Sequence, residues 1–176
     1  MPQDSAIEIQ VATVAQLFHT LDPFPFRERD LDSEAEEFIV GWARELPKTQ
    51  PIRIIVHLPR AEAQTDRGAG LHQAINQYFS YRAEAATREM KELLRIGRYS
   101  LAVGLVVLGL CIAAGHAVVA YRGSELGQFV EEGLIILGWV ANWRPIEIFL
   151  YDWWPILRRR RLLRRLAVAD VVLAPR

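Results

Sequence analysis

The clearest feature of the chain is an uninterrupted apolar stretch of 23 residues, YSLAVGLVVLGLCIAAGHAVVAY, at positions 99–121. A helix of this length spans ~34 Å at ~1.5 Å per residue, which exceeds the ~30 Å hydrocarbon core of a bilayer. The stretch carries no formal charge and is apolar on all sides, whereas the helices of soluble proteins keep a polar face. It therefore predicts a first transmembrane helix.

A second apolar segment follows after the short, polar stretch 122–130, which is expected to be a periplasmic loop. The segment LIILGWVANW, residues 134–143, covers only ~15 Å as a helix, so it must continue past Arg144 to cross a bilayer. Continuing it favours a second transmembrane helix over residues 131–155, kinked at Pro145, with Arg144 near its middle.

An alternative starts the second span earlier, near Leu126, and turns the chain into the membrane interface at Pro145. The many aromatic residues that follow would then form an interfacial belt. Glu131 and Glu132 weigh against this early start, because both would lie among the lipid tails.

The basic residues set the orientation of the predicted hairpin. Five bases between positions 82 and 98 precede the first span, whereas the 122–130 loop has one base, Arg122. Basic residues favour the cytoplasmic side, so both termini are expected there, the second in a basic tail over residues 156–176. Six arginines of this tail are expected to bind anionic lipid headgroups: Arg158, Arg159, Arg160, Arg161, Arg164 and Arg165.

The N-terminal third of the chain has the pattern of a small α/β domain, residues 1–60. Alternating apolar positions in AIEIQVA and PIRIIVHLP predict two short strands, one at each end of this region. Between them, Ser33 and Glu36 form a capping box ahead of a helix that ends at Pro47. Five residues are expected to form its apolar face: Ala35, Phe38, Ile39, Trp42 and Leu46. A βαβ connection would make the strands parallel.

A linker is expected over residues 61–70, followed by an amphipathic stalk helix over residues 71–98 that runs into the first span. Two strands and one helix bury little surface, so the domain is expected to depend on this stalk or on a partner. The predicted fold is thus α+β: a small cytoplasmic βαβ-type domain, a stalk helix and a two-helix transmembrane hairpin.

Charge and cysteine content narrow the classes of protein. Residues 1–80 carry 12 acids and 7 bases, whereas residues 81–176 carry 9 acids and 14 bases, so the second part is expected to meet an anionic surface. The arginine run follows a predicted membrane exit, which favours lipid over nucleic acid as that surface. The single cysteine, Cys111, excludes a disulfide framework within the chain, and residues 1–10 do not resemble a cleavable signal peptide.

Catalytic motifs are missing from the sequence. It has no phosphate-binding loop, no HExxH and no GxSxG, and the four histidines fall in four different predicted elements. No cofactor or metal site is predicted. An enzyme would require a cleft in which residues such as His57, Asp30 or Glu37 converge.

The most unusual feature is a set of polar residues within the second predicted span. Arg144, Glu147, Tyr151 and Asp152 recur three, seven and eight residues apart, which places them on one side of a helix. They are interpreted either as a site for a partner or an ion, which is usual for intramembrane charges, or as a structural ion pair at the kink.

Small residues in the first predicted span give a second candidate surface. Gly109, Ala113 and Ala117 recur at four-residue spacing, which would allow another helix to approach closely, although small residues are common in membrane helices anyway. The histidine of this span, His116, is expected to pack rather than to bind a ligand.

Two stretches, LFHTLDPFPFRERDLDSEAEEFIVGWARELP at 17–47 and WRPIEIFLYDWWP at 143–155, resemble a group of small bacterial inner-membrane proteins with two spans. The resemblance implies location in the bacterial inner membrane and no catalytic residues. The leading hypothesis is a non-enzymatic scaffold or accessory subunit that binds itself or another membrane protein. The alternative is an oligomeric ion or proton pathway that uses Arg144 and Glu147.

Overall fold

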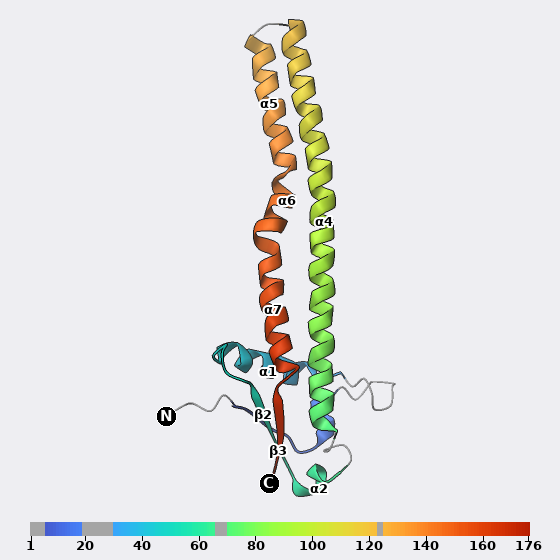
Figure 1. Ribbon diagram of the computed structural model, residues 1–176, viewed down its shortest axis with the longest axis vertical. Coiled ribbons are helices and arrows are strands. Elements are labelled where there is room, and N and C mark those ends of the chain that lie inside the picture. Colours follow the sequence, from blue (N-terminus) through green and yellow to red (C-terminus); the bar gives the residue numbers. More distant parts are fainter. Residues whose placement is uncertain (1–5, 19–29, 66–69, 123–124) are drawn as a thin grey trace. The chain divides into compact units, whose positions relative to one another are not determined.

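The computed structural model describes residues 6–18, 30–65, 70–122 and 125–176 (Figure 1). The chain divides into two compact units. Residues 1–87 with 158–176 form the first, called here the α/β unit, and residues 88–157 form the second, called the helical unit. The division falls inside two helices, α4 (Leu71–Arg122) and α7 (Trp153–Leu166).

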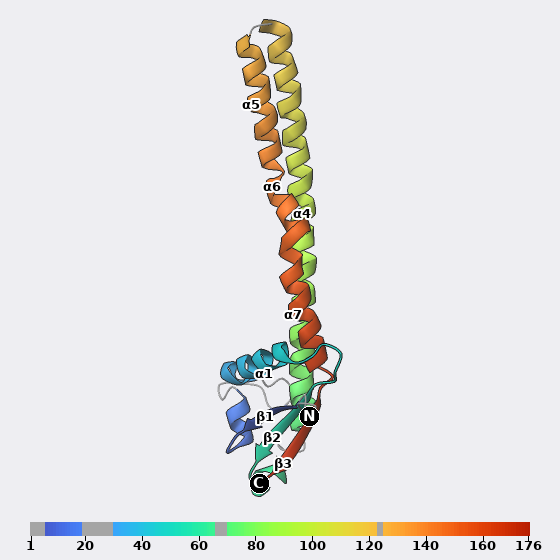
Figure 2. The same ribbon diagram turned by 90° about the vertical axis from the view of Figure 1, so that its left-hand side faces the viewer.

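The α/β unit is built on a parallel sheet of three strands in the order β1-β2-β3 (Figure 2). These are β1 (Ala6–Gln10), β2 (Arg53–Leu58) and β3 (Asp170–Pro175). The parallel pairing of β1 with β2 agrees with the expectation from the sequence. The third strand was not expected, because its segment was interpreted as part of a basic tail.

The tail is instead ordered secondary structure. Residues up to Leu166 continue α7, and the apolar run Val171–Leu173 pairs with Ile54–Val56 of the central strand. This run is too short to identify a strand by itself, and only its neighbour β2 makes it one. The prediction of a basic tail over 156–176 is therefore wrong, because the C-terminal segment completes the sheet.

Helix α1 (Ser33–Glu45) begins and packs differently from the prediction. Its N-cap is Asp32, whose side chain accepts the backbone N–H of Glu34 at 2.9 Å, so Ser33 does not cap it. Ile39 is buried as expected, but Phe38 and Trp42 are 44% and 50% exposed. The error arises because these aromatics lie beside Ile39 on the helical wheel, and only the position of the sheet decides which flank is covered.

The core of the α/β unit draws on both ends of the chain. Alternate residues of β2, Ile54, Val56 and Leu58, are fully buried on one face of the sheet. The first turns of α4 and the end of α7 contribute apolar side chains to the same core: Leu71, Ile75, Phe79, Leu163 and Leu166. The dependence of the domain on its stalk thus agrees with the sequence, whereas the contribution of α7 was not expected. Two short helices, η1 (Val14–Leu17) and α2 (Arg60–Ala63), complete the unit.

The helical unit combines the second part of α4 with an interrupted helix. Helix α4 covers 52 residues, including the whole predicted stalk and first apolar stretch. The return path consists of α5 (Glu125–Ala141), α6 (Trp143–Glu147), a π-helix η2 (Ile148–Asp152) and α7. Two stretches, Leu71–Tyr121 and Glu125–Leu166, are long and apolar enough to cross a membrane by length and composition.

Several predicted boundaries differ from the structure. The predicted loop 122–130 is too long, since residues from Glu125 onward are helical, and residues 123–124 lie outside the described part. The helix that contains the end of the predicted second span, residue 155, continues to Leu166, so the helix is longer than the predicted span. The predicted linker 61–70 begins within α2, and its residues 66–69 lie outside the described ranges.

Candidate functional site

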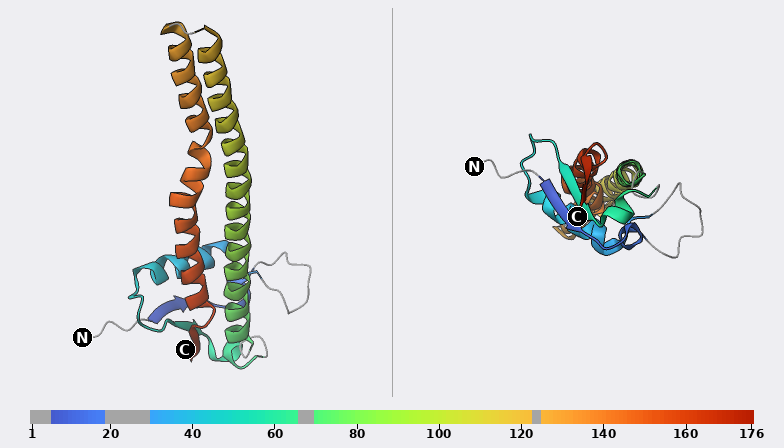
Figure 3. Two further views of the ribbon diagram at one scale, coloured as in Figure 1. Left: turned by 45° about the horizontal axis from the view of Figure 1, so that its top comes forward. Right: turned by 90° about the horizontal axis from the view of Figure 1, so that it is seen from below.

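In the helical unit, α4 and α5 lie side by side and run in opposite directions (Figure 3). Glycines mark their closest approach. A Cβ built on Gly104 would lie 2.5 Å from the Oδ1 atom of Asn142, and one on Gly115 would lie 3.0 Å from the side chain of Glu131. A Cβ on Gly138 of α5 would lie 2.7 Å from Leu108. The residues of α4 that face its partner, 97, 104, 108, 111 and 115, follow the three- and four-residue spacing of a coiled-coil seam.

The small residues selected from the sequence do not form this seam. Gly109, Ala113 and Ala117 are all exposed, and no atom lies within 4 Å of a Cβ built on Gly109. They do not pack against the second helix of their own chain, as hairpin packing would require. The four-residue spacing identified a row of small residues, but the choice between two such rows depended on the partner helix. Contact of this row with another chain stays a prediction.

Asn142 stands at the break between α5 and α6 and is the buried polar residue of this unit, 4% exposed. Its backbone N–H bonds to Trp139 rather than to Gly138, which leaves the Gly138 carbonyl without its helical donor. The Asn142 side-chain Nδ2 donates to that carbonyl and to the Gly104 carbonyl of α4, both at 3.0 Å. The Asn142 amide thus satisfies the carbonyl left free at the end of α5 and also joins α5 to α4. Its Oδ1 atom has no hydrogen-bond partner.

Pro145 lies three residues after Asn142 and explains part of this break. Proline has no N–H, so it cannot bond to the Ala141 carbonyl one turn earlier. The helix therefore ends at Ala141 and restarts at Trp143, with Pro145 in the first turn, where proline is tolerated. The sequence identified the proline but not the asparagine. The combination of a buried asparagine with a proline three residues later is the pattern that could have identified it.

An ion cluster follows directly after the break. The Nη1 atom of Arg144 lies 3.2 Å from Oε2 of Glu147 and 3.1 Å from Oδ2 of Asp152. The indole N–H of Trp143 donates to Oε1 of Glu147 at 3.0 Å. These four residues are called the ion cluster below. Their side chains are not enclosed, since Arg144, Glu147 and Asp152 are 61%, 41% and 33% exposed.

The π-helix η2 lies between Glu147 and Asp152. A π turn holds more residues than an α turn and changes the direction of the side chains that follow, and such turns are frequent at functional sites. The structure brings together three of the four residues selected from the sequence. Tyr151 is not among the partners of the cluster and is 67% exposed.

A second polar contact joins the two helices farther along α4. The Nε2 atom of His116 lies 3.4 Å from Oε1 of Glu131, beside the close approach at Gly115. The sequence predicted a packing role for His116 and no partner. The antiparallel register between α4 and α5, which no local pattern encodes, brings the two residues together.

In the α/β unit, a hollow of about 670 Å³ lies at the carboxyl ends of β1 and β2, where open parallel sheets usually bind ligands. Gln10, Gln16, His57 and Arg176 are among the residues that line it. The Nε2 atom of His57 lies 3.3 Å from Oε2 of Glu8. Glu37 lines a different hollow, on α1, so it does not converge with His57.

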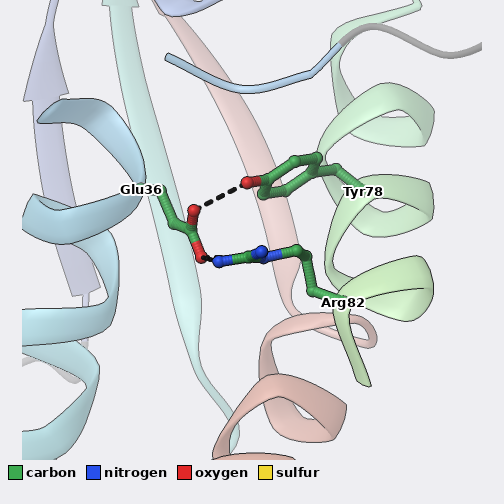
Figure 4. A network of polar contacts seen from close by, with 3 residues as sticks. All are labelled: Glu36, Tyr78 and Arg82. Atoms are coloured by element: carbon green, nitrogen blue, oxygen red, sulfur yellow. Dashed lines mark hydrogen bonds and ion pairs between the residues drawn. The ribbon is translucent and has the colours of Figure 1, made fainter. Parts of the chain in front are cut away.

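A three-residue network joins α1 to α4 (Figure 4). Tyr78 donates its hydroxyl hydrogen to Oε2 of Glu36 at 2.7 Å, and Arg82 donates from Nε and Nη2 to Oε1 at 3.0 and 2.7 Å. Burial, followed by the bond to the carboxylate, raises the pKa of Tyr78. The hydrogen bond to Glu36 raises the pKa of Arg82. Every group has its partner, which indicates a structural clamp rather than a reactive site.

The six arginines selected from the sequence belong to α7, and their half of this helix lies within the α/β unit. Arg165 donates to the carbonyls of Pro47 and Gln50 at 2.8 and 3.0 Å, and Leu163 and Leu166 beside it are buried in the core. Arg165 therefore holds the segment after α1, a role that the sequence did not indicate.

Comparisons with protein-family models, with curated proteins and with solved structures found no match to this chain. No family is assigned to it.

Proposed function

We propose that the chain is a non-enzymatic membrane protein of the bacterial inner membrane, with two spans and both termini in the cytoplasm. Its role is that of a scaffold or accessory subunit, which binds a second copy or another membrane protein through the ion cluster. The observation that carries the proposal is the position of this exposed cluster in the otherwise apolar stretch 134–157.

Exposed apolar side chains support the membrane part of the proposal. Only 17% and 22% of the most apolar windows of the two long helices are buried within the chain, so they do not form the core of a soluble domain. Large apolar side chains along both helices are more than half exposed, and contiguous surfaces of this kind are covered by lipid or protein. Among them are Val103, Val106, Leu110, Ile136, Leu137 and Val140.

The register between α4 and α5 supports an estimate of how deep Arg144 would lie in the hydrocarbon layer. Asn142 lies beside Gly104 and Glu131 lies beside Gly115, and these levels are ~17 Å apart at ~1.5 Å per residue. A hydrocarbon layer of ~30 Å centred between them would extend ~7 Å past each. Arg144, two residues past Asn142, would then lie roughly 4 Å inside the boundary, rather than near the middle as the sequence suggested.

At this depth, a protein partner would satisfy the charged groups of the ion cluster better than lipid would. One base and two acids leave a net charge of −1 close to the membrane boundary, where anionic headgroups would repel it. Arg144 can reach water by extending its side chain. At ~1.5 Å per residue, Glu147 would lie at the boundary and Asp152 outside it, at the level of the headgroups. A partner that supplies a hydrogen-bond donor or a cation would satisfy both carboxylates.

Site-specific photocrosslinking in native membranes tests the proposal. A photoreactive phenylalanine analogue replaces Tyr151, which is 67% exposed next to the cluster, and in a matched variant replaces Tyr121, which is 91% exposed near the far end of α4. A protein adduct is expected from position 151 and not from position 121. In a double variant, Glu147→Gln with Asp152→Asn, the adduct should be lost, whereas Glu132→Gln, an exposed acid of α5, should retain it.

A chain that gives only lipid adducts from position 151, and remains a monomer by native mass spectrometry in mild detergent, would contradict the partner proposal. A chain that stays soluble and monodisperse without detergent would contradict the membrane proposal.

The ion or proton pathway takes second place. The ion cluster favours it, because carboxylates within a span often carry protons. The register between α4 and α5 opposes a pathway. Between Asn142 and the level of Glu131, ~17 Å of largely apolar contact would offer no polar groups to an ion or proton. Flux into liposomes that contain the wild-type chain, abolished by Glu147→Gln, would support the pathway, and absence of flux would eliminate it.

A further inference from the structure

A row of four bases on α4 has no role in the proposed partner site. Arg88, Lys91, Arg95 and Arg98 are spaced three, four and three residues apart, so they share one face of the helix. All four are exposed. Gly97 of the same helix is buried against Ile148 and Phe149, and the row points away from that contact. These four residues are called the basic row.

The basic row surrounds a hollow of about 450 Å³, with Leu94 in its wall. Glu92 is the single acid of the lining, so the charge there is strongly positive. Glu92 lies 3.9 Å from Arg95, with both side chains more than 60% exposed. Such an exposed pair contributes little free energy, so an incoming anion can replace Glu92 as the partner of Arg95 at small cost.

Apolar side chains continue the same face toward the centre of α4. Tyr99 and Val106 follow Arg95 at positions four and eleven, and Val103 lies beside them; these side chains are 65%, 63% and 63% exposed. The guanidinium of Arg95 lies 5.9 Å from the ring centroid of Tyr99, which orients it at the junction. One face of the helix therefore presents cations for ~15 Å and then an apolar surface.

We infer that this face binds an anionic phospholipid, with the phosphate held by Arg95 and Arg98 and an acyl chain lying along Tyr99, Val103 and Val106. The inference rests on the proposed function, since it needs α4 to enter a membrane. Arg95 and Arg98 are three residues apart, ~4.5 Å along the helix axis, so their side chains can extend to one phosphate and bind it through paired hydrogen bonds. Lys91, one turn farther out, adds positive charge for the headgroup.

The order of charge and apolar surface argues for a lipid rather than a soluble phosphate. A free phosphate would use the arginines but leave the neighbouring apolar side chains uncovered. A protein neighbour with acidic residues, such as the ion cluster of a second copy, would also match the charge. The experiment therefore has separate arms for lipid, free phosphate and protein.

Native mass spectrometry of the full chain in mild detergent, titrated with phosphatidylglycerol or phosphatidylcholine, measures the preference for anionic lipid. The double variant Arg95→Gln with Arg98→Gln should bind phosphatidylglycerol about 25-fold more weakly, at roughly fivefold for each base. The matched control, Arg44→Gln with Arg60→Gln, removes the same charge from the α/β unit and should bind normally. Glu92→Gln should bind more tightly, which a misfolded protein would not do.

Equal binding of the two lipids by a detergent-dependent chain would overturn the inference while leaving the membrane proposal intact. Displacement of the lipid by inorganic phosphate at equal concentration would assign the site to soluble phosphate. Loss of an oligomer in the double variant, with lipid binding unchanged, would assign the basic row to a protein neighbour. Each result would refute lipid binding here.

Discussion

Replacement of Gly104 by alanine tests the contact between the two long helices most directly. The added Cβ would lie 2.5 Å from Oδ1 and 3.0 Å from Cγ of Asn142, and 3.1 Å from the carbonyl oxygen of Ala141. The first distance is shorter than real Cβ contacts, the other two are tight, and the oxygen at 3.1 Å belongs to the backbone. Either the Asn142 side chain must leave its position or the helices must separate.

The cost follows from the bonds that Asn142 would lose. Its amide donates to the carbonyls of Gly104 and Gly138, and hydrogen bonds between membrane helices contribute about 0.6 kcal/mol on average and at most ~1.7 kcal/mol each. Leaving the Gly138 carbonyl unpaired in a buried site adds ~1–3 kcal/mol. The higher helix propensity of alanine offsets at most ~1 kcal/mol of this loss in the free energy of unfolding. The net loss is therefore about 2 kcal/mol, a ~30-fold change in the unfolding equilibrium.

The assay is a titration with sodium dodecyl sulfate in mixed micelles, followed by tryptophan fluorescence, since four of the five tryptophans lie between residues 139 and 154. Gly109→Ala is the matched control, because no atom lies within 4 Å of its added Cβ. Its free energy of unfolding should be unchanged or slightly higher. If Gly109→Ala destabilised the chain and Gly104→Ala did not, the register described here would be refuted and the row of small residues would be the true seam.

Three further predictions concern the α/β unit. Glu36→Ala removes three hydrogen bonds and should lower the protection of α1 in hydrogen exchange by about 2 kcal/mol, whereas unchanged protection would show that the clamp contributes nothing. The pKa of Tyr78 is raised in the folded chain, so its contribution to stability is complete below pH ~10 and is lost as the pH rises above this value. Alkaline unfolding should thus be steeper for wild type than for Tyr78→Phe, and equal slopes would contradict the shift. Gly41→Ala should raise the melting temperature, since no atom lies within 4 Å of the new Cβ and α1 gains up to ~1 kcal/mol in helix propensity; a lower melting temperature would show that Gly41 is needed for packing.

The sequence determined the features that depend on local composition and periodicity. The apolar stretch 99–121 lies within one helix, because it contains no proline or turn signal that would end the helix. Alternation along β1 and β2 gave their positions, and the helix between them gave their parallel pairing. The polar residues selected after Asn142 were recognisable because charges are conspicuous among apolar neighbours, and the three charged ones meet in the structure.

Features that depend on distant parts of the chain required the tertiary structure. The strand β3 exists because β2 offers it an edge, and the burial of Ile39 rather than Phe38 depends on the position of the sheet. In the long helices, local pattern allowed two rows of small residues, and the partner helix selected the one through Gly104. Periodicity specifies which residues share one face of a helix or strand. The element that covers this face is decided by packing between segments far apart in the chain, because the contact energies come from that packing.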